Sequence, residues 1–315
     1  MITPVVLVLV AVVSLVTVAY HRDHSLTGQP ESVGLDRPLT SVSTTTTPSS
    51  PTPSPAVSTT PSPTPIPDDP AAAPAAVNAI DALGTSRVQF GVAILDRNTG
   101  TLTLGQEGGT QFYSASVIKL FLVVDILHNV ETGQDTLTDD DVDLIQRALS
   151  RSDDNAMDAL WEDFDGPDAI NQLISLAHLS DTQLPSDLSQ WGETLISPRD
   201  VTAVYQYALT QLSTADQDLV MTALGNAADT GADGFDQAFG LLNPPRPATV
   251  KAKQGWMIYG SQMMLHSTGV LGSRDQYVVA VLSEQRTSIG WAAGRTNVDN
   301  AVGALLTALG PAAVR

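Results

Sequence analysis

The sequence predicts an α+β fold, in which one antiparallel sheet is flanked by helices and an all-helical middle subdomain separates its strands. Three observations predict it. Residues 88–104 hold two short runs of branched and aromatic side chains joined by a turn. From residue 116 to beyond residue 213, apolar residues recur at helical spacing between capping signals. Three more strand-like runs lie between residues 248 and 284, so both ends of the domain supply strands to one sheet.

The first 70 residues lack the apolar patterning of a globular core. Residues 1–20 are almost wholly apolar and nearly long enough to cross a bilayer, so we expect a membrane anchor or a signal peptide. Residues 21–70 are expected to be a disordered linker, because their centre is nearly all Thr, Ser and Pro. The globular domain is expected at residues 71–315. This order predicts an extracytoplasmic domain, tethered to the cell membrane, or secreted if the first segment is cleaved.

Charge and cysteine content exclude several kinds of site. The chain has 15 Lys and Arg against 34 Asp and Glu, a formal charge of −19. Such an acidic protein repels nucleic acid, so we expect no nucleic-acid partner. The sequence has no cysteine, which excludes disulfides, thiolate nucleophiles, cysteine zinc sites and a lipid-bearing cysteine.

The first elements of the domain are a helix and a strand pair. A helix is expected over residues 72–83, because Gly84 follows as a stop signal. Residues 88–95 are rich in branched and aromatic side chains and predict a strand. The polar residues 96–100 predict a turn, and residues 101–104 return with alternating polarity.

The helical middle carries its own start signals. Thr138 and Asp141 have the form of a capping box, and Ser197 is followed by proline at the first helical position. Helices are expected at 116–130, 139–149 and 154–164, with others opening at 166, at 198 and at Ser213 or Thr214. Strands are then expected at 248–253, 263–270 and 276–284, and a closing helix at 297–309.

The stretch around Ser116 organises the rest of the domain. Ser116 and Lys119 form a Ser-x-x-Lys, and residues three apart on a helix lie on one face. An amine partly stripped of water has a lowered pKa and can take the proton of a neighbouring serine hydroxyl. A backbone N–H at the start of the helix can face a developing oxyanion. The pair therefore suits nucleophilic acyl transfer.

This motif is weak when taken alone. A capping serine and an exposed lysine occur three apart by chance in most chains of this length. The next residues, 120–124, are wholly apolar, which predicts a buried helix rather than an amphipathic one. A lysine at the head of a buried helix needs a chemical reason, and this favours the catalytic interpretation.

With this motif and this order of elements, the chain resembles the serine β-lactamases, chiefly class A, and the related penicillin-binding proteins. Their signatures are Ser-x-x-Lys, Ser-Asp-Asn and Lys-Thr-Gly. The resemblance covers residues 72–315 and implies the β-lactamase/transpeptidase-like fold. It implies that Lys119 deprotonates the nucleophile Ser116, and that the backbone N–H groups of Ser116 and Trp256 bind the oxyanion.

The second motif of the resemblance falls in residues 150–155, between two expected helices. In one register, Ser152 is the serine that relays a proton to the leaving nitrogen, and Asp154 stands where the family has asparagine. In the other, Asn155 is the asparagine that holds the substrate amide, and Asp153 stands where serine belongs. We favour the first register for the serine, with a local bulge that lets Asn155 reach the substrate. A helix cap by Ser152 or Asp153 is the plainer alternative.

The third motif is expected at the end of a strand, as Lys253, Gln254 and Gly255 followed by Trp256. The resemblance implies that Lys253 supplies positive charge beside the substrate carboxylate and the proton relay. Gly255 would let the substrate approach the strand edge. Gln254 replaces a threonine or serine, so a hydroxyl contact to that carboxylate is missing. A plain surface lysine is the alternative.

Class A enzymes also carry a glutamate, in an omega-shaped loop, that activates the water for deacylation. The corresponding residues 181–196 contain no Glu-x-x-Leu-Asn. Glu193 is their only glutamate and Asp187 is a stand-in, although solvated loop charges are the commoner role for such residues. The loss of this glutamate should slow deacylation more than acylation.

Together these features predict an exported serine hydrolase that forms an acyl-enzyme on an amide, from a β-lactam or a cell-wall peptide, with slow deacylation. The alternative is a non-catalytic cell-wall-binding or scaffold protein with a degenerate form of this fold, and a third option is an esterase that uses the same pair. We expect no cofactor and no metal, because no histidine pair has ligand spacing. The expected partners of this monomer are a β-lactam or peptidoglycan-derived small molecule and, through residues 1–20, the membrane.

Overall fold

The structure of the chain is a computed structural model that describes residues 69–314. The anchor and linker expected over residues 1–70 lie outside the described residues, except for Asp69 and Pro70. Within the described part, no helix combines the length and the apolar character that a membrane span requires.

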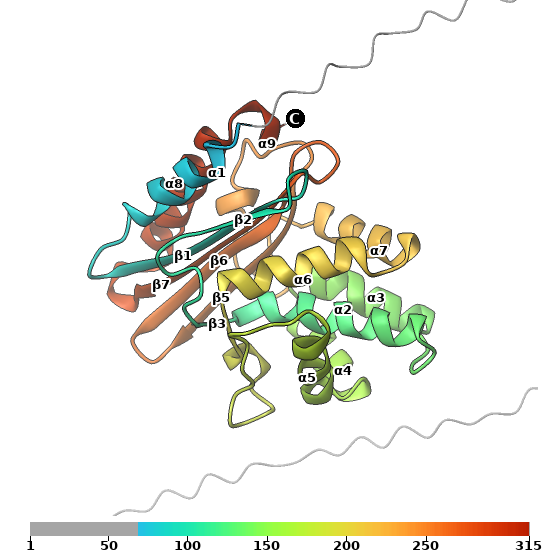
Figure 1. Cartoon of the computed structure of the whole chain (residues 1–315). Helices are drawn as coiled ribbons and strands as arrows, with labels where there is room; N and C mark the ends of the chain where they lie inside the picture. The colour runs from blue at the N-terminus through green and yellow to red at the C-terminus, as the bar shows by residue number, and fades with distance from the viewer. Residues whose placement is uncertain (1–68, 315) are drawn as a thin grey trace, which may run out of the picture. The chain divides into compact units, whose positions relative to one another are not determined.

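Among the described residues, a five-stranded antiparallel sheet has the order β2-β1-β7-β6-β5 (Figure 1). The first strand, β1, pairs along its whole length with the last strand, β7. The sheet expected from both ends of the domain is therefore confirmed. Strand β5 is left at one edge. The bounds are β1 Val88–Asp96, β2 Thr101–Leu104, β5 Lys251–Tyr259, β6 Gln262–Leu271 and β7 Tyr277–Arg286.

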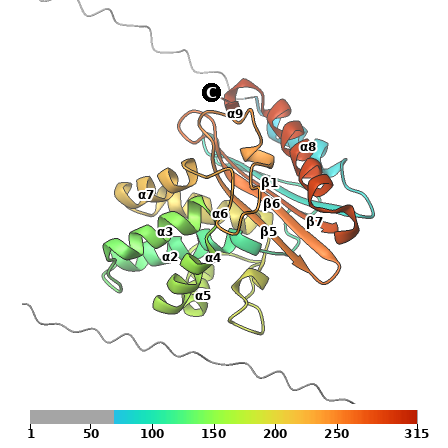
Figure 2. The ribbon, with the colours of Figure 1, turned by 180° about the vertical axis from the view of Figure 1, so that it is seen from behind.

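Helices cover both faces of this sheet because β7 is apolar on both sides. Val278, Ala280 and Leu282 belong to one hydrophobic core, whereas Val279 and Val281 belong to the other. Successive side chains of a strand point to opposite faces, so an unbroken apolar run needs cover on each. The face that carries Val279 and Val281 is covered by a layer of helices from the two ends of the domain (Figure 2). These are α1 Ala72–Asp81, α8 Trp291–Leu309 and the short α9 Pro311–Val314.

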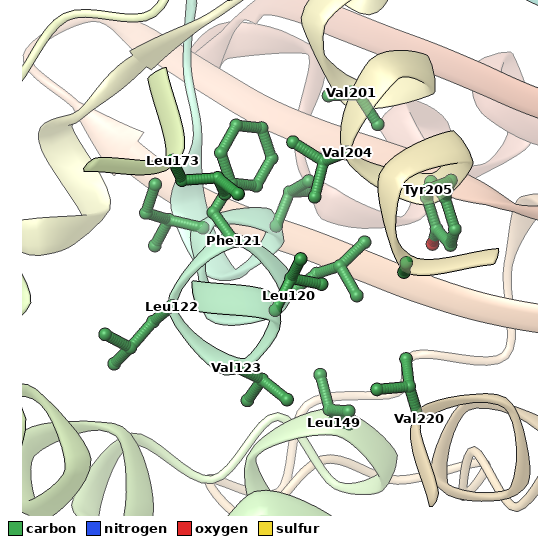
Figure 3. Close-up of a cluster of buried hydrophobic side chains, with 14 of the residues drawn as sticks. Leu120, Phe121, Leu122, Val123, Leu149, Leu173, Val201, Val204, Tyr205 and Val220 are labelled. Atoms are coloured by element: carbon green, nitrogen blue, oxygen red, sulfur yellow. The ribbon is translucent and has the colours of Figure 1, made fainter. Parts of the chain in front are cut away.

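The other face carries the helical half, which is built around α2 (Ile118–Glu131). Residues 118–127 of α2 are all buried, as the apolar run after Lys119 predicted. Figure 3 shows Leu120, Phe121 and Leu122 pointing in different directions from the helix. Each such buried side chain contributes about 1.5–3 kcal/mol to stability. The surrounding helices are α3 Asp139–Ser150, α4 Asp154–Asp163, α5 Gly166–Leu176, α6 Pro198–Thr210 and α7 Thr214–Gly225.

The helix starts follow the capping signals of the sequence. Thr138 and Asp141 form the capping box of α3. Ser197 caps α6, with proline at the first helical position. Ser213, rather than Thr214, caps α7. Each cap satisfies a backbone N–H that has no partner within its own helix.

Several short elements were not predicted. Strand β3 (Phe112–Tyr113) pairs with β4 (Leu195–Ile196), and two residues are too few to show an alternating pattern. This pairing ties the segment before Ser116 to the loop that contains Glu193. The 3-10 turns are η1 Ala115–Val117, η2 Trp191–Glu193, η3 Gly240–Leu242 and η4 Thr287–Ile289.

Two expected boundaries were wrong. The strand expected over residues 248–253 is β5, from Lys251 to Tyr259, so the third motif lies within a strand and not at its end. Its polar residues broke the apolar pattern, but pairing with β6 continues to Tyr259.

The closing helix, expected from residue 297, begins at Trp291. Gly294 concealed its first turns, because glycine is unfavourable inside helices. A Cβ on Gly294 would clash with the Cε methyl of Met263. The glycine therefore lets α8 pack closely on the sheet.

Candidate active site

Ser116 lies in the 3-10 turn η1, directly before α2, and not in the first turn of the α-helix as expected. The preceding Ala115 has a φ of 47°, in the left-handed region that residues with a Cβ rarely adopt. Backbone strain of this kind is concentrated at functional sites. Ser116 is 6% exposed and lines a pocket of about 480 Å³, so its hydroxyl is not sealed inside the protein.

Lys119 meets Ser116 across one turn, as their spacing predicted. Its Nζ donates a hydrogen bond of 2.8 Å to Ser116 Oγ, and its side chain is 0% exposed. The same Nζ lies 2.8 Å from the carbonyl oxygen of Ser152 and 2.5 Å from Asp154 Oδ1. It also lies 4.8 Å from the centre of the Trp191 ring. The amine is therefore surrounded by acceptors.

Two opposing effects act on the Lys119 amine. Burial lowers the pKa of Lys119 from its usual value, and attraction by the Asp154 carboxylate opposes this shift. Burial is the larger effect. An amine with a lowered pKa spends more time unprotonated near neutral pH and can then accept a proton from serine.

Ser152 connects the two lysines of the site. Its φ of 54° places it in the left-handed region, at the break between α3 and α4. Its carbonyl accepts from Lys119, and its Oγ accepts a hydrogen bond of 2.7 Å from Lys253 Nζ. The cap of α4 is instead Asp153, whose carboxylate accepts from two backbone N–H groups of that helix. The helix-cap alternative therefore applies to Asp153, and the Ser152 hydroxyl is engaged by Lys253.

Lys253 is 1% exposed, which contradicts the alternative of a surface lysine. It lies in the edge strand β5, and its Nζ also donates to the carbonyl of Gln254 at 2.9 Å. Burial, with repulsion from the nearby Lys119 as the smaller cause, holds the pKa of Lys253 well below its usual value. Lys253, the lysine expected from the distant strand, therefore contacts Ser152, whose carbonyl oxygen Lys119 also contacts.

The two candidates for the substrate-binding position of the second motif separate in the structure. Asp154 lines the pocket, where its side chain is 61% exposed and pairs with Lys119. Asn155 is exposed and is not among the residues that line the pocket. Helix α4 begins at Asp154 without a bulge, and successive helical side chains point about 100° apart. The expectation that a bulge brings Asn155 to the substrate is therefore not met.

The register that puts Asp153 in place of the serine is not supported by this arrangement. Asp153 is buried, and its carboxylate accepts a hydrogen bond of 2.7 Å from Arg147. Asp153 is thus occupied in holding the end of α3 to the start of α4.

Gln254 and Gly255, the second and third residues of the third motif, lie on opposite faces of β5. Gln254 is buried, its side-chain amide donates to the carbonyl of Phe239, and its Oε1 has no partner in the described part of the chain. It does not line the pocket, so the expected substrate contact by Gln254 is not met. A Cβ on Gly255 would lie 3.1 Å from the carbonyl oxygen of Ser114 and 3.1 Å from Val117 Cγ2. Glycine at this position lets β5 approach the turn that carries Ser116.

Trp256 lines the pocket, as its place after the third motif suggested. Its Nε1 donates a hydrogen bond of 2.9 Å to Asp233 Oδ2. Its ring stacks on Phe235, with centroids 4.8 Å apart and an angle of 13° between the planes. These contacts fix the orientation of the indole at the pocket wall.

Glu193 also lines the pocket, from the turn η2, so it is not a plain solvated loop charge. It is half-buried, and its carboxylate makes no hydrogen bond or ion pair with the residues that the structure describes. Asp187 instead caps its own loop by accepting from the backbone and hydroxyl of Ser189. Of the two stand-ins named from the sequence, only Glu193 reaches the pocket.

Among the pocket-lining residues that sequence reasoning missed are Trp191, Asp158 and Asp233. Trp191 Nε1 donates a hydrogen bond of 2.8 Å to Asp158, as Trp256 does to Asp233. No motif marks these residues. The usable signal was the rarity of tryptophan, since two of the four in the chain line this pocket.

His266 offers no rival catalytic base. It is buried in β6, its Nε2 lies 2.7 Å from the Tyr113 carbonyl, and its Nδ1 accepts from the Ser283 N–H. Burial lowers the pKa of His266 to about 4, so the ring is neutral and structural. Within residues 69–314, no group of three or more His, Asp or Glu side chains could hold a metal ion.

The chain is similar to known proteins. A family model described as the beta-lactamase enzyme family matches residues 75–142 and 141–309. The chain belongs to the β-lactamase enzyme family. This family member is 33% identical over 212 residues to proteins named "Putative lipoprotein LppW" in Mycobacterium bovis and Mycobacterium tuberculosis. The match covers 66% of this chain and 67% of each relative.

Solved β-lactamase structures share the fold of this family member. A class A β-lactamase from Bacteroides cellulosilyticus has a TM-score of 0.61 at 16% identity, covering 76% of this chain and 98% of its own. A β-lactamase from Sphaerobacter thermophilus has a TM-score of 0.60 at 19% identity, covering 75% of this chain and 97% of its own. At such identities the likeness shows the β-lactamase fold alone.

Proposed function

We propose that this member of the β-lactamase family is a serine hydrolase that forms an acyl-enzyme on an amide or ester carbonyl, such as that of a β-lactam or a cell-wall peptide. The observation that supports it best is the hydrogen bond of 2.8 Å between Lys119 Nζ and Ser116 Oγ, because the amine is buried and the serine lines a pocket. A buried amine beside a reachable hydroxyl is the arrangement that activates a serine without histidine.

Acylation begins when unprotonated Lys119 accepts the hydroxyl proton of Ser116. The Oγ atom forms a bond to the carbonyl carbon, and the carbonyl oxygen becomes the oxyanion. The backbone N–H groups of Ser116 and Trp256 are the proposed donors to that oxyanion. The lowered pKa of Lys119 supports this role, because a fully protonated amine has no lone pair to offer.

The leaving group departs with a proton. Ser152 Oγ, held 2.7 Å from Lys253 Nζ, gives its proton to the leaving nitrogen or oxygen as the bond from the carbonyl carbon breaks. The proton that Lys119 took from Ser116 then passes to Ser152, directly or through Lys253, so that both lysines return to their starting states. Water attack on the ester of Ser116 completes the cycle. We propose that this step is slow, because residues 181–196 contain no Glu-x-x-Leu-Asn.

A non-catalytic binding role is the second candidate, and one observation favours it. Asp154 Oδ1 lies 2.5 Å from Lys119 Nζ, where it favours the protonated amine. Gln254, in place of a hydroxyl residue, points away from the pocket. A domain with these changes can keep a cleft for cell-wall fragments while losing the reaction.

We further propose that the domain works outside the cytoplasm. Residues 1–20 are apolar enough for a membrane anchor or signal peptide, and the relatives carry the name "Putative lipoprotein". This sequence has no cysteine for a lipid, so its tether would be the apolar segment itself.

Mass spectrometry of the intact protein tests the reaction. We expect a stable mass increase after incubation with benzylpenicillin or with the neutral ester p-nitrophenyl acetate, and digestion should place it on Ser116. Ser116→Ala should remove the adduct, and Lys119→Met, which keeps the buried volume, should slow its formation by at least about a hundredfold. Peptidoglycan fragments that bind equally well to all three proteins, with no adduct on any, would favour the binding role.

A further inference from the structure

The pocket around Ser116 is lined by an unusual excess of negative charge. Four carboxylates line it, and within the described residues its lining contains no arginine and no lysine. The carboxylates belong to Asp154, Asp158, Glu193 and Asp233. They come from helix α4, from the turn η2 and from the loop between α7 and β5, so the charge surrounds the pocket rather than marking one wall.

The buried lysines do not cancel this charge. Lys119 pairs with Asp154, and Lys253, which does not line the pocket, donates a hydrogen bond to Ser152. Even with both amines protonated, four carboxylates against two ammonium groups leave two negative charges over. Burial lowers the pKa of both amines, which leaves the pocket more negative still.

The remaining carboxylates have neutral partners or none. Asp158 accepts from the indole N–H of Trp191, and Asp233 accepts from that of Trp256. Glu193 makes no ion pair with any described residue. These contacts orient the carboxylates without neutralising them, so their field is available to a bound molecule.

Two aromatic rings complete the lining. The face of a tryptophan ring attracts cations, and Lys119 Nζ already lies 4.8 Å from the centre of the Trp191 ring. Aromatic rings beside carboxylates form the usual environment for alkylammonium groups in proteins. The same walls oppose a carboxylate, and the side chain of Gln254, which stands where the family has a hydroxyl residue, does not line the pocket.

We propose that this pocket takes acyl donors that carry an alkylammonium group in the acyl chain, a few bonds from the scissile carbonyl, and that it disfavours donors with a carboxylate at that place. The inference rests on the proposed acyl-transfer function and names its substrate class. The whole chain supports it, because a formal charge of −19 attracts cations and repels anions before they reach the pocket.

Three p-nitrophenyl esters of matched length test the charge alone. The cationic ester is that of 5-(trimethylammonio)pentanoate, the neutral one is its tert-butyl isostere, 6,6-dimethylheptanoate, and the anionic one is the monoester of adipate. The measured quantity is the second-order rate constant for acylation of the full chain, taken from the burst of nitrophenolate and divided by the rate of spontaneous hydrolysis. This constant is independent of how fast the acyl-enzyme is hydrolysed.

We expect the cationic ester to acylate Ser116 fastest and the anionic ester slowest, with about tenfold or more between them. Raising the salt concentration from about 50 mM to about 500 mM should reduce this ratio, because added ions screen the carboxylates. Glu193→Gln should lower the ratio of cationic to neutral ester. Glu162→Gln, the same change on the exposed part of α4 outside the pocket, should leave that ratio as it is.

The outcomes separate the two proposals. If the neutral ester acylates Ser116 but the cationic ester is no faster than its isostere, the charge preference is wrong and the hydrolase proposal stands. If the ratio responds neither to salt nor to Glu193→Gln, the preference does not come from the pocket, and the inference is overturned. If none of the three esters modifies Ser116, the proposed function is wrong, and the inference that rests on it is wrong as well.

Discussion

Lys253 Nζ and Ser152 Oγ lie 2.7 Å apart, although 101 positions separate the two residues in the chain. The contact joins the edge strand of the sheet to the break between two helices of the helical half. Because Lys119 contacts the carbonyl of the same Ser152, one residue binds both buried amines. The proposed chemistry depends on this convergence.

Removing the hydroxyl of Ser152 should affect the reaction and not the fold. We expect Ser152→Ala to slow acylation by about a hundredfold or more, because the leaving group loses its proton donor. Thermal unfolding should change little, since Asp153 and not Ser152 caps α4. Asp153→Ala is the matched control, and it should lower stability by about 1 kcal/mol through the lost cap. Equal acylation rates in Ser152→Ala and the unaltered protein would contradict the relay.

Replacing Asp154 by asparagine should shift the pH dependence of acylation. Asp154 raises the pKa of Lys119 against the effect of burial, so its removal lowers that pKa further. Acylation requires unprotonated Lys119 and therefore rises with pH through this pKa. We expect the rising limb of the pH–rate profile for Asp154→Asn to move to lower pH. A rising limb at the same pH in both proteins would show that Asp154 does not affect the pKa of Lys119.

Asp125 should make the protein less stable as the pH rises. It is buried in α2, its Oδ1 has no partner among the described residues, and burial raises its pKa to about 7. The folded state therefore holds the Asp125 proton up to about pH 7, whereas the unfolded chain releases it near pH 4. The free energy of unfolding that this group contributes therefore falls between about pH 4 and about pH 7 and does not recover at higher pH.

Asp125→Asn removes this penalty. We expect a gain of at least about 1–2 kcal/mol near pH 8 and none near pH 4. The measurement is urea unfolding of both proteins at the two pH values. A loss of equal size at both would mean that the carboxylate makes a needed contact instead.

Gly255 should matter for activity because of how closely β5 approaches the turn before Ser116. A Cβ placed 3.1 Å from the Ser114 carbonyl oxygen and from Val117 Cγ2 must push the turn and the strand apart. We expect Gly255→Ala to slow acylation by about tenfold or more, since small misplacements of reacting groups are costly. Gly303→Ala is the control: its Cβ would meet nothing within 4 Å, so α8 should gain about 0.5–1 kcal/mol. An unchanged acylation rate in Gly255→Ala would show that the close approach of β5 to the turn before Ser116 is not needed for the reaction.

The features that the sequence determined by itself are local or periodic. The α+β class, the helix starts at Thr138 and Ser197, and the buried character of α2 were predicted, because caps and apolar spacing act within a few residues. The placing of Ser116 and Lys119 within hydrogen-bond reach was predicted for the same reason, since both lie on one turn. The resemblance to the β-lactamase family added the order of the motifs along the chain.

Only the tertiary structure decided which residues meet across the chain. It brought Glu193 into the pocket through the pairing of two-residue strands, and it turned Gln254 and Asn155 away from it. It also gathered Asp158 and Asp233 around the nucleophile, although neither belongs to a motif. Such contacts depend on how strands and helices pack, and no pattern of neighbouring residues encodes a distance between segments far apart in sequence. The charge of the pocket, on which its proposed substrate depends, is therefore a property of the fold.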